Sequence, residues 1–254
     1  MALNEQWVYP HDVEENTTIP TGMPSIIFDT ETTGLIDPRI IEAGWIETDI
    51  SPDGQLLYGM PFVQRYNPEI PSTLGALKVH NILDSELVNM PLHTTFSVPE
   101  TVKYIICQNS SFDMKMVPNP EKYKAICIVG MSTKLWPEAD SHSLGAMMYH
   151  VFGRTEQVRT ILKDAHSALT DCMMTWSLLQ QIIEKANIKS IEDLFKFSEM
   201  AKLTTERMPF GKYKGMYLVD IVGIEKSYLA WLRDNREMDD NLRTIAGKIL
   251  KGCS

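Results

Sequence analysis

Apolar positions along the chain alternate between short continuous runs and longer stretches with helical spacing. The runs predict buried strands near residues 25–30, 40–50, 56–66, 104–109 and 123–129. Apolar residues spaced three and four positions apart predict helices near residues 72–80, 98–103, 131–136, 142–152, 167–186 and 190–203. The turn signal Pro52-Asp53-Gly54 separates two of the strands and predicts a hairpin. Strands mixed with helices in this way indicate an α/β fold.

The same pattern divides the 254 residues into four parts. Residues 1–24 include three prolines and are expected to form an irregular leader. Residues 25–187 contain the predicted sheet and are expected to form the main domain. A helical linker is expected at residues 188–208, and a small C-terminal segment at residues 209–254.

Composition narrows the class of protein. The hydrophobic fraction of 44% is typical of a globular core, and no apolar stretch reaches the roughly 18 residues of a membrane span. The first basic residue is Arg39, so the N-terminus lacks the basic segment of a secretory signal. The four cysteines show no paired spacing, which favours reduced core thiols over a zinc site. We therefore expect a cytoplasmic protein.

Two acidic side chains follow the first predicted strand at alternating positions. Asp29 and Glu31 come directly after the apolar run 25–28 and point to the same face, because side chains in a strand alternate. Two buried carboxylates on one face repel each other unless a cation lies between them. The alternative is an exposed strand end, but the apolar residues before the pair favour a buried metal site.

Two further acids and a histidine occur later in the chain. Asp113 lies in the loop after the fourth predicted strand, where a single acid is usually a helix cap. Asp171 lies in the early turns of the helix predicted at 167–186, where it could simply pair with the helix dipole. His166 comes just before that helix. Four acids and one histidine in a pocket can hold two divalent metals and activate a water, which suits phosphodiester hydrolysis.

These motifs resemble those of the DEDDh 3′–5′ exonucleases, which include polymerase proofreading subunits and ribonuclease T. The family motif Asp-x-Glu-Thr-Thr-Gly-Leu is matched at residues 29–35. The motif His-x-Ala-x-x-Asp is matched by His166, Ala168 and Asp171, and the motif His-Asn-x-x-Phe-Asp is matched at 109–113, with Gln108 in place of the histidine. An Ala-x-x-x-His-x-Ile element is matched by Ala76, His80 and Ile82.

The resemblance covers about residues 25–185 and implies a ribonuclease H-like fold, an α/β fold with a mixed five-stranded sheet flanked by helices. It places a DEDDh exonuclease domain at 25–187. Residues 209–215 and 228–232 resemble the C-terminal segment of the exodeoxyribonuclease X type, which implies a small C-terminal appendage and favours a free-standing nuclease.

The resemblance also implies a set of catalytic roles. Asp29, Glu31 and Asp171 would hold one metal, Asp29 would bridge to a second, and Asp113 would complete the shell. All-oxygen ligands favour two Mg²⁺ or Mn²⁺ ions per site. His166 is implied as the general base. The expected products are nucleoside 5′-monophosphates released from the 3′ end of DNA, single-stranded or duplex.

Contacts to nucleic acid are expected near the first motif and in the C-terminal segment. The expected contact residues are Thr32, Gly34, Leu35, Ile36, His80, Asn109, Phe112, Lys212 and Lys214. Leu35 would unstack terminal bases as an apolar wedge, or else cap the sheet as a core residue. Lys212 and Lys214 flank Tyr213 between two glycines, as in a loop that touches phosphates and a base. The structural alternative is a β-turn with Tyr213 packed on the helix that contains Trp231.

Charge distribution bears on the same question, because the net charge of −9 is unusual for a protein that binds nucleic acid. Residues 201–254 hold 10 Lys and Arg against 7 Asp and Glu, so the acidic excess lies in the rest of the chain. Non-specific affinity would then come mostly from the C-terminal segment. A solvated helical face is the alternative interpretation of this basic end.

Three other functions remain open from the sequence. One is an RNA-trimming exonuclease similar to ribonuclease T or oligoribonuclease, and another is a polymerase proofreading subunit. The third is a nucleic-acid-binding module without catalysis, against which the presence of all five expected catalytic residues argues. RNA or a protein bound to the C-terminal segment are therefore further partners to consider.

Overall fold

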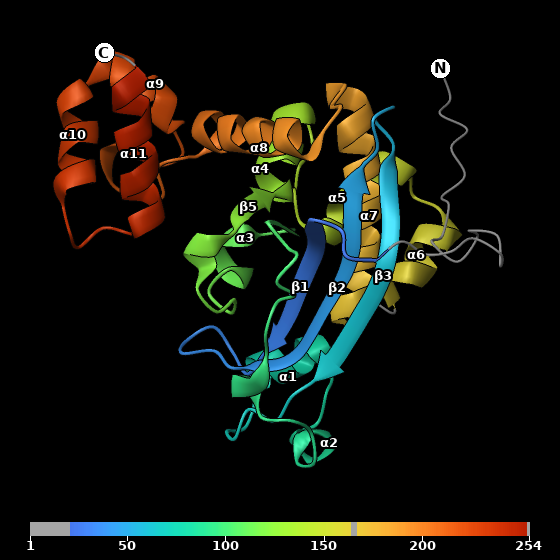
Figure 1. Cartoon of the computed structure of the whole chain (residues 1–254). Coiled ribbons are helices and arrows are strands. Elements are labelled where there is room, and N and C mark those ends of the chain that lie inside the picture. Colours follow the sequence, from blue (N-terminus) through green and yellow to red (C-terminus); the bar gives the residue numbers. More distant parts are fainter. Residues whose placement is uncertain (1–20, 164–166, 253–254) are drawn as a thin grey trace.

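The computed structural model describes residues 21–163 and 167–252, and it is built around one five-stranded mixed sheet (Figure 1). Its strands are β1 (Ser25–Thr32), β2 (Ile40–Ile50), β3 (Leu56–Arg65), β4 (Tyr104–Cys107) and β5 (Lys124–Cys127), in the order β3-β2-β1-β4-β5. β1 pairs antiparallel with β2 and parallel with β4. The structure thus confirms the predicted ribonuclease H-like sheet.

Helices cover the sheet and extend beyond it. Those between β3 and the end of the sheet are α1 (Leu74–His80), α2 (Asp84–Leu87), α3 (Ser110–Asp113) and α4 (Ile128–Leu135). They are followed by α5 (Leu144–Phe152), α6 (Glu156–Lys163), α7 (Ala168–Ala186) and α8 (Ile191–Thr205). Short 3₁₀ turns occur at η2 (His93–Thr95), η3 (Pro120–Lys122) and η4 (Gly211–Tyr213). Among the described helices, none is long and apolar enough to cross a membrane.

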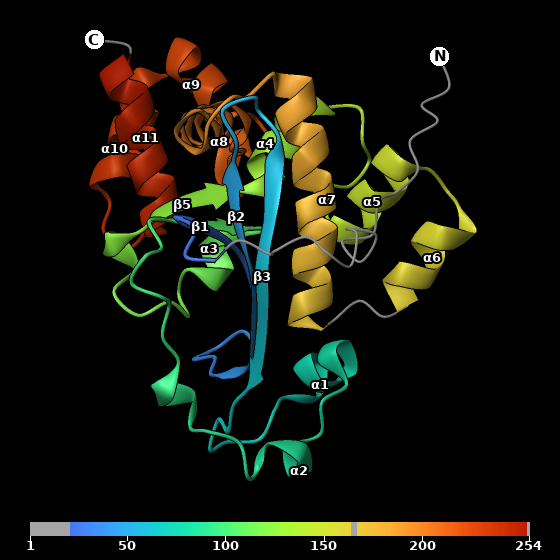
Figure 2. The ribbon, with the colours of Figure 1, turned by 45° about the vertical axis from the view of Figure 1, so that its right-hand side comes forward.

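The longest helix, α7, lies along one face of β1, β2 and β3 (Figure 2). Alternation along β1 explains how both faces of the sheet become buried. Ile27 packs into the core shared with α4, α5 and α7, whereas Ile26 and Phe28 pack into the core on the other face. Burial of apolar surface on both faces fixes the register of β1, because a slip of one residue would exchange the two sets.

One predicted helix is wrong and several short helices were not predicted. Residues 98–103 form a single turn, with Val102 N donating to the carbonyl of Pro99 at 3.1 Å. Val98 and Val102 are both buried, and because they lie four positions apart their spacing in the sequence resembles that of a helix. The short helices α2 and α3 have only four residues each, too few for a clear apolar period, whereas α6 (Glu156–Lys163) is amphipathic and was missed.

The C-terminal helices α9 (Leu218–Ile224), α10 (Lys226–Asp234) and α11 (Asp240–Gly252) have their own hydrophobic core. They lie beyond α8, away from the sheet (Figure 1). α8 packs against β5 and α4 along its length and also contacts α9 and α11. One of its contacts to the sheet is a hydrogen bond from Cys127 N to Ser198 Oγ of 2.9 Å. α8 therefore packs against both the sheet region and the C-terminal helices.

Candidate active site

Three carboxylates meet between β1 and α7. Asp29 and Glu31 lie on β1, on the face that Ile27 shares with α7, and Asp171 lies in the first turn of α7. One carboxylate oxygen from each residue lies within 4.8 Å of the others. This cluster has the predicted composition, and the alternation of β1 places its two strand residues side by side.

The approach of α7 to the sheet depends on Gly44 of β2. A Cβ atom at this position would lie 2.8 Å from both the carbonyl carbon of Ala168 and the backbone nitrogen of Leu169. The Gly44 carbonyl also accepts a hydrogen bond from Cys172 Sγ, with a donor–acceptor distance of 3.4 Å. Only glycine lets the first turn of α7 lie this close to β2, and that turn carries Asp171.

A residue that the sequence did not single out completes this contact. Glu42 on β2 is buried, and its Oε1 accepts a hydrogen bond from the backbone N–H of Ala168 at 3.0 Å. Its Oε2 accepts from Arg65 Nε, also at 3.0 Å. The available signal was a glutamate inside the apolar run 40–46, where an unpaired charge would be costly.

Asp113 lies near the cluster but is not one of the three residues whose carboxylate oxygens lie within 4.8 Å of one another. It is buried in α3 and accepts a hydrogen bond from Thr30 Oγ1 at 3.0 Å through Oδ1. Its charge nevertheless contributes to the field at Asp29. β1 therefore presents Asp29 and Glu31 to α7, and Thr30 between them anchors the fourth predicted acid.

The carboxylates of the site are buried and repel one another, and their pKa values are raised as a result. Burial, followed by repulsion from Asp113 and Asp171, raises the pKa of Asp29 well above its usual range. Burial and the charge of Asp171 raise the pKa of Glu31 to about 8. Burial also raises the pKa of Asp113 to about 7, against the opposing effect of the hydrogen bond from Thr30. Carboxylate oxygens crowded in this way are the ligands that hard divalent cations prefer, so these residues fit a Mg²⁺ or Mn²⁺ site.

His166 lies outside the described residues, so its role as general base stays a prediction. In the sequence it directly precedes Ser167, the N-cap residue of α7.

A pocket of about 500 Å³ opens next to Glu31. Six of the residues predicted to contact nucleic acid line it, namely Thr32, Gly34, Leu35, Ile36, His80 and Phe112. Most of the rest of its lining comes from α1 and from Thr73, the N-cap residue of that helix. The pocket is therefore continuous with the carboxylates and largely apolar in its walls.

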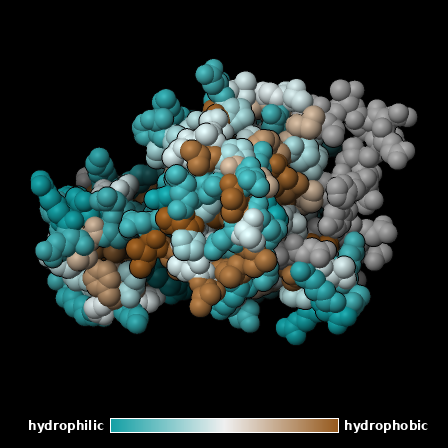
Figure 3. All heavy atoms as spheres, turned by 90° about the horizontal axis from the view of Figure 1, so that it is seen from below, coloured by the Kyte–Doolittle hydropathy of each residue, from teal (hydrophilic) through white to brown (hydrophobic). Residues whose placement is uncertain are grey.

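Leu35 and Ile36 project from the loop after β1 and are 85% and 89% exposed. The interpretation of Leu35 as a core residue is therefore wrong. The loop is fixed at its base, where Thr73 N donates to the carbonyl of Thr33 at 2.8 Å and a Cβ on Gly34 would lie 3.1 Å from the Thr73 side chain. Figure 3, which views the molecule from the side of α1 and α2, shows apolar residues gathered on this face.

His80, at the end of α1, lines the pocket and has a buried polar atom in its ring. Its Nδ1 accepts a hydrogen bond from Ile82 N at 3.0 Å, so the neutral ring carries its proton on Nε2. Nε2 is buried and has no hydrogen-bond partner among the described residues. Burial lowers the pKa of His80, which favours the neutral ring. A residue of the pocket wall thus has an N–H donor without a partner among the described residues.

The other three predicted contact residues lie elsewhere. Asn109 precedes α3 and does not line the pocket. Lys212 forms an ion pair with Glu225, with 2.5 Å between Nζ and Oε2, and Tyr213 donates to the same carboxylate at 2.7 Å. The Tyr213 ring meets Tyr228 on α10, the helix that contains Trp231. The structure thus shows the packing that the structural alternative describes, in a 3₁₀ turn. Lys214 is exposed.

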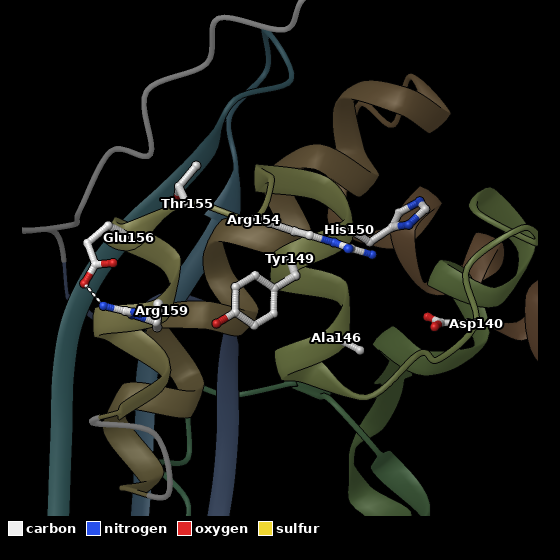
Figure 4. Close-up of a pocket in the computed structure, with 8 residues that line it drawn as sticks. All are labelled: Asp140, Ala146, Tyr149, His150, Arg154, Thr155, Glu156 and Arg159. Carbon is white, nitrogen blue, oxygen red and sulfur yellow. Dashed lines mark hydrogen bonds and ion pairs between the residues drawn. The ribbon is translucent and has the colours of Figure 1, made fainter.

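A second cavity of about 700 Å³ lies on the surface of α5 and α6 (Figure 4). Its charged residues include Arg159 and Glu156, which form an ion pair with a 2.5 Å separation. It contains none of the predicted site residues and no member of the carboxylate cluster. The chemistry of the described residues therefore centres on the pocket beside β1.

A ribonuclease H-like sheet with two acids on β1, one on α3 and one at the start of α7 is the arrangement that the resemblance to the DEDDh exonucleases implies, and in this the chain is similar to that family. It is 27% identical over 220 residues to Exodeoxyribonuclease 10 of Escherichia coli (strain K12), covering 85% of this chain and 94% of that protein.

Solved structures support the fold. The structure described as "Exonuclease X in complex with 5' overhanging duplex DNA" matches with a TM-score of 0.52 and 24% identity, covering 68% of this chain and 99% of that chain. An exonuclease I from Methylocaldum szegediense matches with a TM-score of 0.51 and 19% identity, over 70% of this chain and 45% of the other. A family described as "Putative quorum-sensing-regulated virulence factor" matches residues 196–237, from within α8 to just after α10.

Proposed function

We propose that the protein is a metal-dependent 3′–5′ exonuclease that hydrolyses DNA from the 3′ end to nucleoside 5′-monophosphates. The observation that carries this proposal is the cluster of Asp29, Glu31 and Asp171 directly beside an apolar pocket. The similarity of the chain to Exodeoxyribonuclease 10, over nearly the whole length of that protein, supports the same reaction.

The residues of the site divide the chemistry among them. Asp29, Glu31 and Asp171 would hold the cations, with Asp29 shared between two ions and Asp113 completing the shell. When bound, such ions act as Lewis acids that activate the attacking water and stabilise charge on the leaving oxygen. His166 takes the proton from that water, since an unperturbed histidine titrates near neutral pH.

The pocket would receive the terminal nucleotide. Its apolar walls suit a base and a sugar, and the Nε2–H of His80 provides a single donor for an oxygen or nitrogen acceptor of that nucleotide. The backbone at Thr32 and Gly34 would lie against the nucleotide, and Phe112 would pack beside it. Leu35 and Ile36, which stand out from the surface, would meet the next bases.

The proposal is tested with purified protein on end-labelled single-stranded DNA, duplex DNA and RNA of one sequence, with Mg²⁺, Mn²⁺ or EDTA. We expect stepwise shortening from the 3′ end of DNA with Mg²⁺ or Mn²⁺, and 5′-monophosphates as products. Full activity in EDTA would exclude the metal-dependent mechanism. Degradation of RNA in preference to DNA would instead support the RNA-trimming alternative.

Leu35→Ala is expected to lower the rate on a blunt duplex more than on single strands, because only the duplex has to be unstacked. The measurement is the ratio of kcat/KM for the two substrates. Leu74→Ala is the matched control, since Leu74 is 82% exposed on neighbouring α1 but does not line the pocket. An equal loss on both substrates would show that Leu35 does not open duplex ends.

We propose that Lys214, rather than Lys212, contributes affinity for the DNA backbone, because Lys212 is already paired with Glu225. Lys214→Ala should weaken binding of long DNA and reduce the slope of log affinity against log salt by about one, the value for one phosphate contact. Lys212→Ala should instead lower the melting temperature, since it breaks the link between η4 and Glu225. An unchanged salt slope for Lys214→Ala would argue that this segment does not grip the substrate.

A further inference from the structure

We propose that Glu42 is a positioning residue that holds the first turn of α7, and with it Asp171, against β1. The proposal rests on the proposed function of the carboxylate cluster. Glu42 is not a member of that cluster, and we assign it the role of holding one member in place. The side chain of Glu42 is 5% exposed, so its two hydrogen bonds are shielded from solvent. Buried carboxylates are retained only where such partners compensate for lost hydration.

The first contact of Glu42 satisfies a backbone donor that a helix cannot satisfy itself. Ala168 is the first residue of α7, and its N–H is one of the four amides at a helix start that have no partner within the helix. Glu42 Oε1 accepts from this amide at 3.0 Å. A negative charge at a helix N-terminus also interacts favourably with the helix dipole. Glu42 therefore fixes where α7 begins relative to β2.

The second contact fixes the orientation of Glu42 itself. Arg65 on β3 donates through Nε to Glu42 Oε2 at 3.0 Å, and through Nη1 to Glu86 Oε1 on α2 at 2.9 Å. Arg65 is 38% exposed, so its charge remains hydrated on one side while the other side neutralises Glu42. The chain of contacts runs from α7 across β2 and β3 to α2.

The position of Asp171 follows from this arrangement. Asp171 is three residues after Ala168 on the same helix, and Gly44 allows the helix backbone to approach β2. A shift of the first turn would move Asp171 away from Asp29 and Glu31, whose positions are set by β1. Residues that orient metal ligands typically change metal affinity or activity by about 10–100-fold when they are removed.

The test compares Glu42→Ala and Glu42→Gln with the wild type by Mn²⁺ affinity in calorimetry, by kcat and KM on a short oligonucleotide, and by hydrogen exchange of the Ala168 amide. Glu42→Ala should lower Mn²⁺ affinity and kcat by about 10–100-fold with little change in KM. It should also accelerate exchange at Ala168. Glu42→Gln should have Mn²⁺ affinity, kcat and exchange rates between those of the wild type and Glu42→Ala. Its amide oxygen can still accept from Ala168 N, but the ion pair with Arg65 is lost.

Two further variants separate positioning from general stability. Glu47→Gln is the matched control, because Glu47 lies on the same strand five residues away and its side chain accepts, among the described residues, a hydrogen bond from Met23 N at 3.3 Å. Gly44→Ala should also lower Mn²⁺ affinity by moving α7 without changing a charge. Glu42→Gln keeps the test of Glu42 itself decisive if Glu42→Ala fails to fold. A folded Glu42→Ala protein with wild-type Mn²⁺ affinity and wild-type exchange at Ala168 would overturn the proposal. Both of these measurements are made without substrate, so a wild type that does not degrade DNA would overturn the proposed function alone.

Discussion

Replacing Asp29 by asparagine is expected to abolish exonuclease turnover and, at the same time, to stabilise the metal-free protein at pH 8. The first effect is expected because Asp29 would be shared by both cations of the proposed site, so that its loss would disassemble the whole site. The second arises because burial and four neighbouring carboxylates raise the pKa of Asp29 far above its usual range. An asparagine of the same size removes the charge that the metal-free site cannot accommodate.

The sign of the pH dependence follows from the direction of these shifts. Asp29, Glu31 and Asp113 all have a higher pKa in the folded protein than in the unfolded chain, with Glu31 at about 8 and Asp113 at about 7. The folded state therefore binds protons more tightly, and the metal-free protein loses stability as the pH rises from about 4 to 8. Bound divalent cations should remove most of this loss, because they bind the ionised form.

Melting temperatures in EDTA and in Mg²⁺, at pH 5.5 and pH 8, measure this effect. The wild type in EDTA should melt at a lower temperature at pH 8 than at pH 5.5, and Asp29→Asn should reduce that difference. Asp220→Asn is the control, because Asp220 is an exposed acid on α9 outside the carboxylate cluster. A less stable Asp29→Asn protein in EDTA at pH 8, or one that retains turnover, would contradict the account of the site.

The parts of the site that could be predicted are those with a local signal in the sequence. Alternation after an apolar run places Asp29 and Glu31 on one face of β1, and the apolar period of α7 places Asp171 near its start. The hydrogen bond from Ala168 to Glu42 joins residues 126 positions apart, and the position of Glu42 in an apolar run indicates that it needs a partner without indicating which one. Likewise, the tautomer of His80 depends on a contact with Ile82 that only coordinates show.

The C-terminal helices illustrate a second limit. α9 and α10 have only 7 and 9 residues, and isolated helices of that length are marginal in water. Their stability comes from a shared core with α11, which includes Leu218, Leu229 and Ile245. The sequence showed two cations beside an aromatic residue at 212–214, but the partner that neutralises Lys212 is Glu225, 13 residues away. Tertiary pairing of this kind decides whether a cation is available to a phosphate.

His166→Ala is expected to slow the chemical step by about 10²–10⁴-fold, the usual contribution of a general base. Cation binding should remain, because the proposed ligands Asp29, Glu31 and Asp171 are unchanged. The measurement is the single-turnover rate at saturating Mg²⁺, together with Mn²⁺ affinity in calorimetry.

His150→Ala is the matched control for His166→Ala, because His150 lies on α5 at the second cavity and pairs with Glu138 at 3.4 Å. It should keep the wild-type rate and pH profile. The opposite pattern for His166→Ala would be a loss of Mn²⁺ affinity with a normal single-turnover rate once the metal is saturating. That result would make His166 a metal ligand, and the proton of the attacking water would then have to pass to another base.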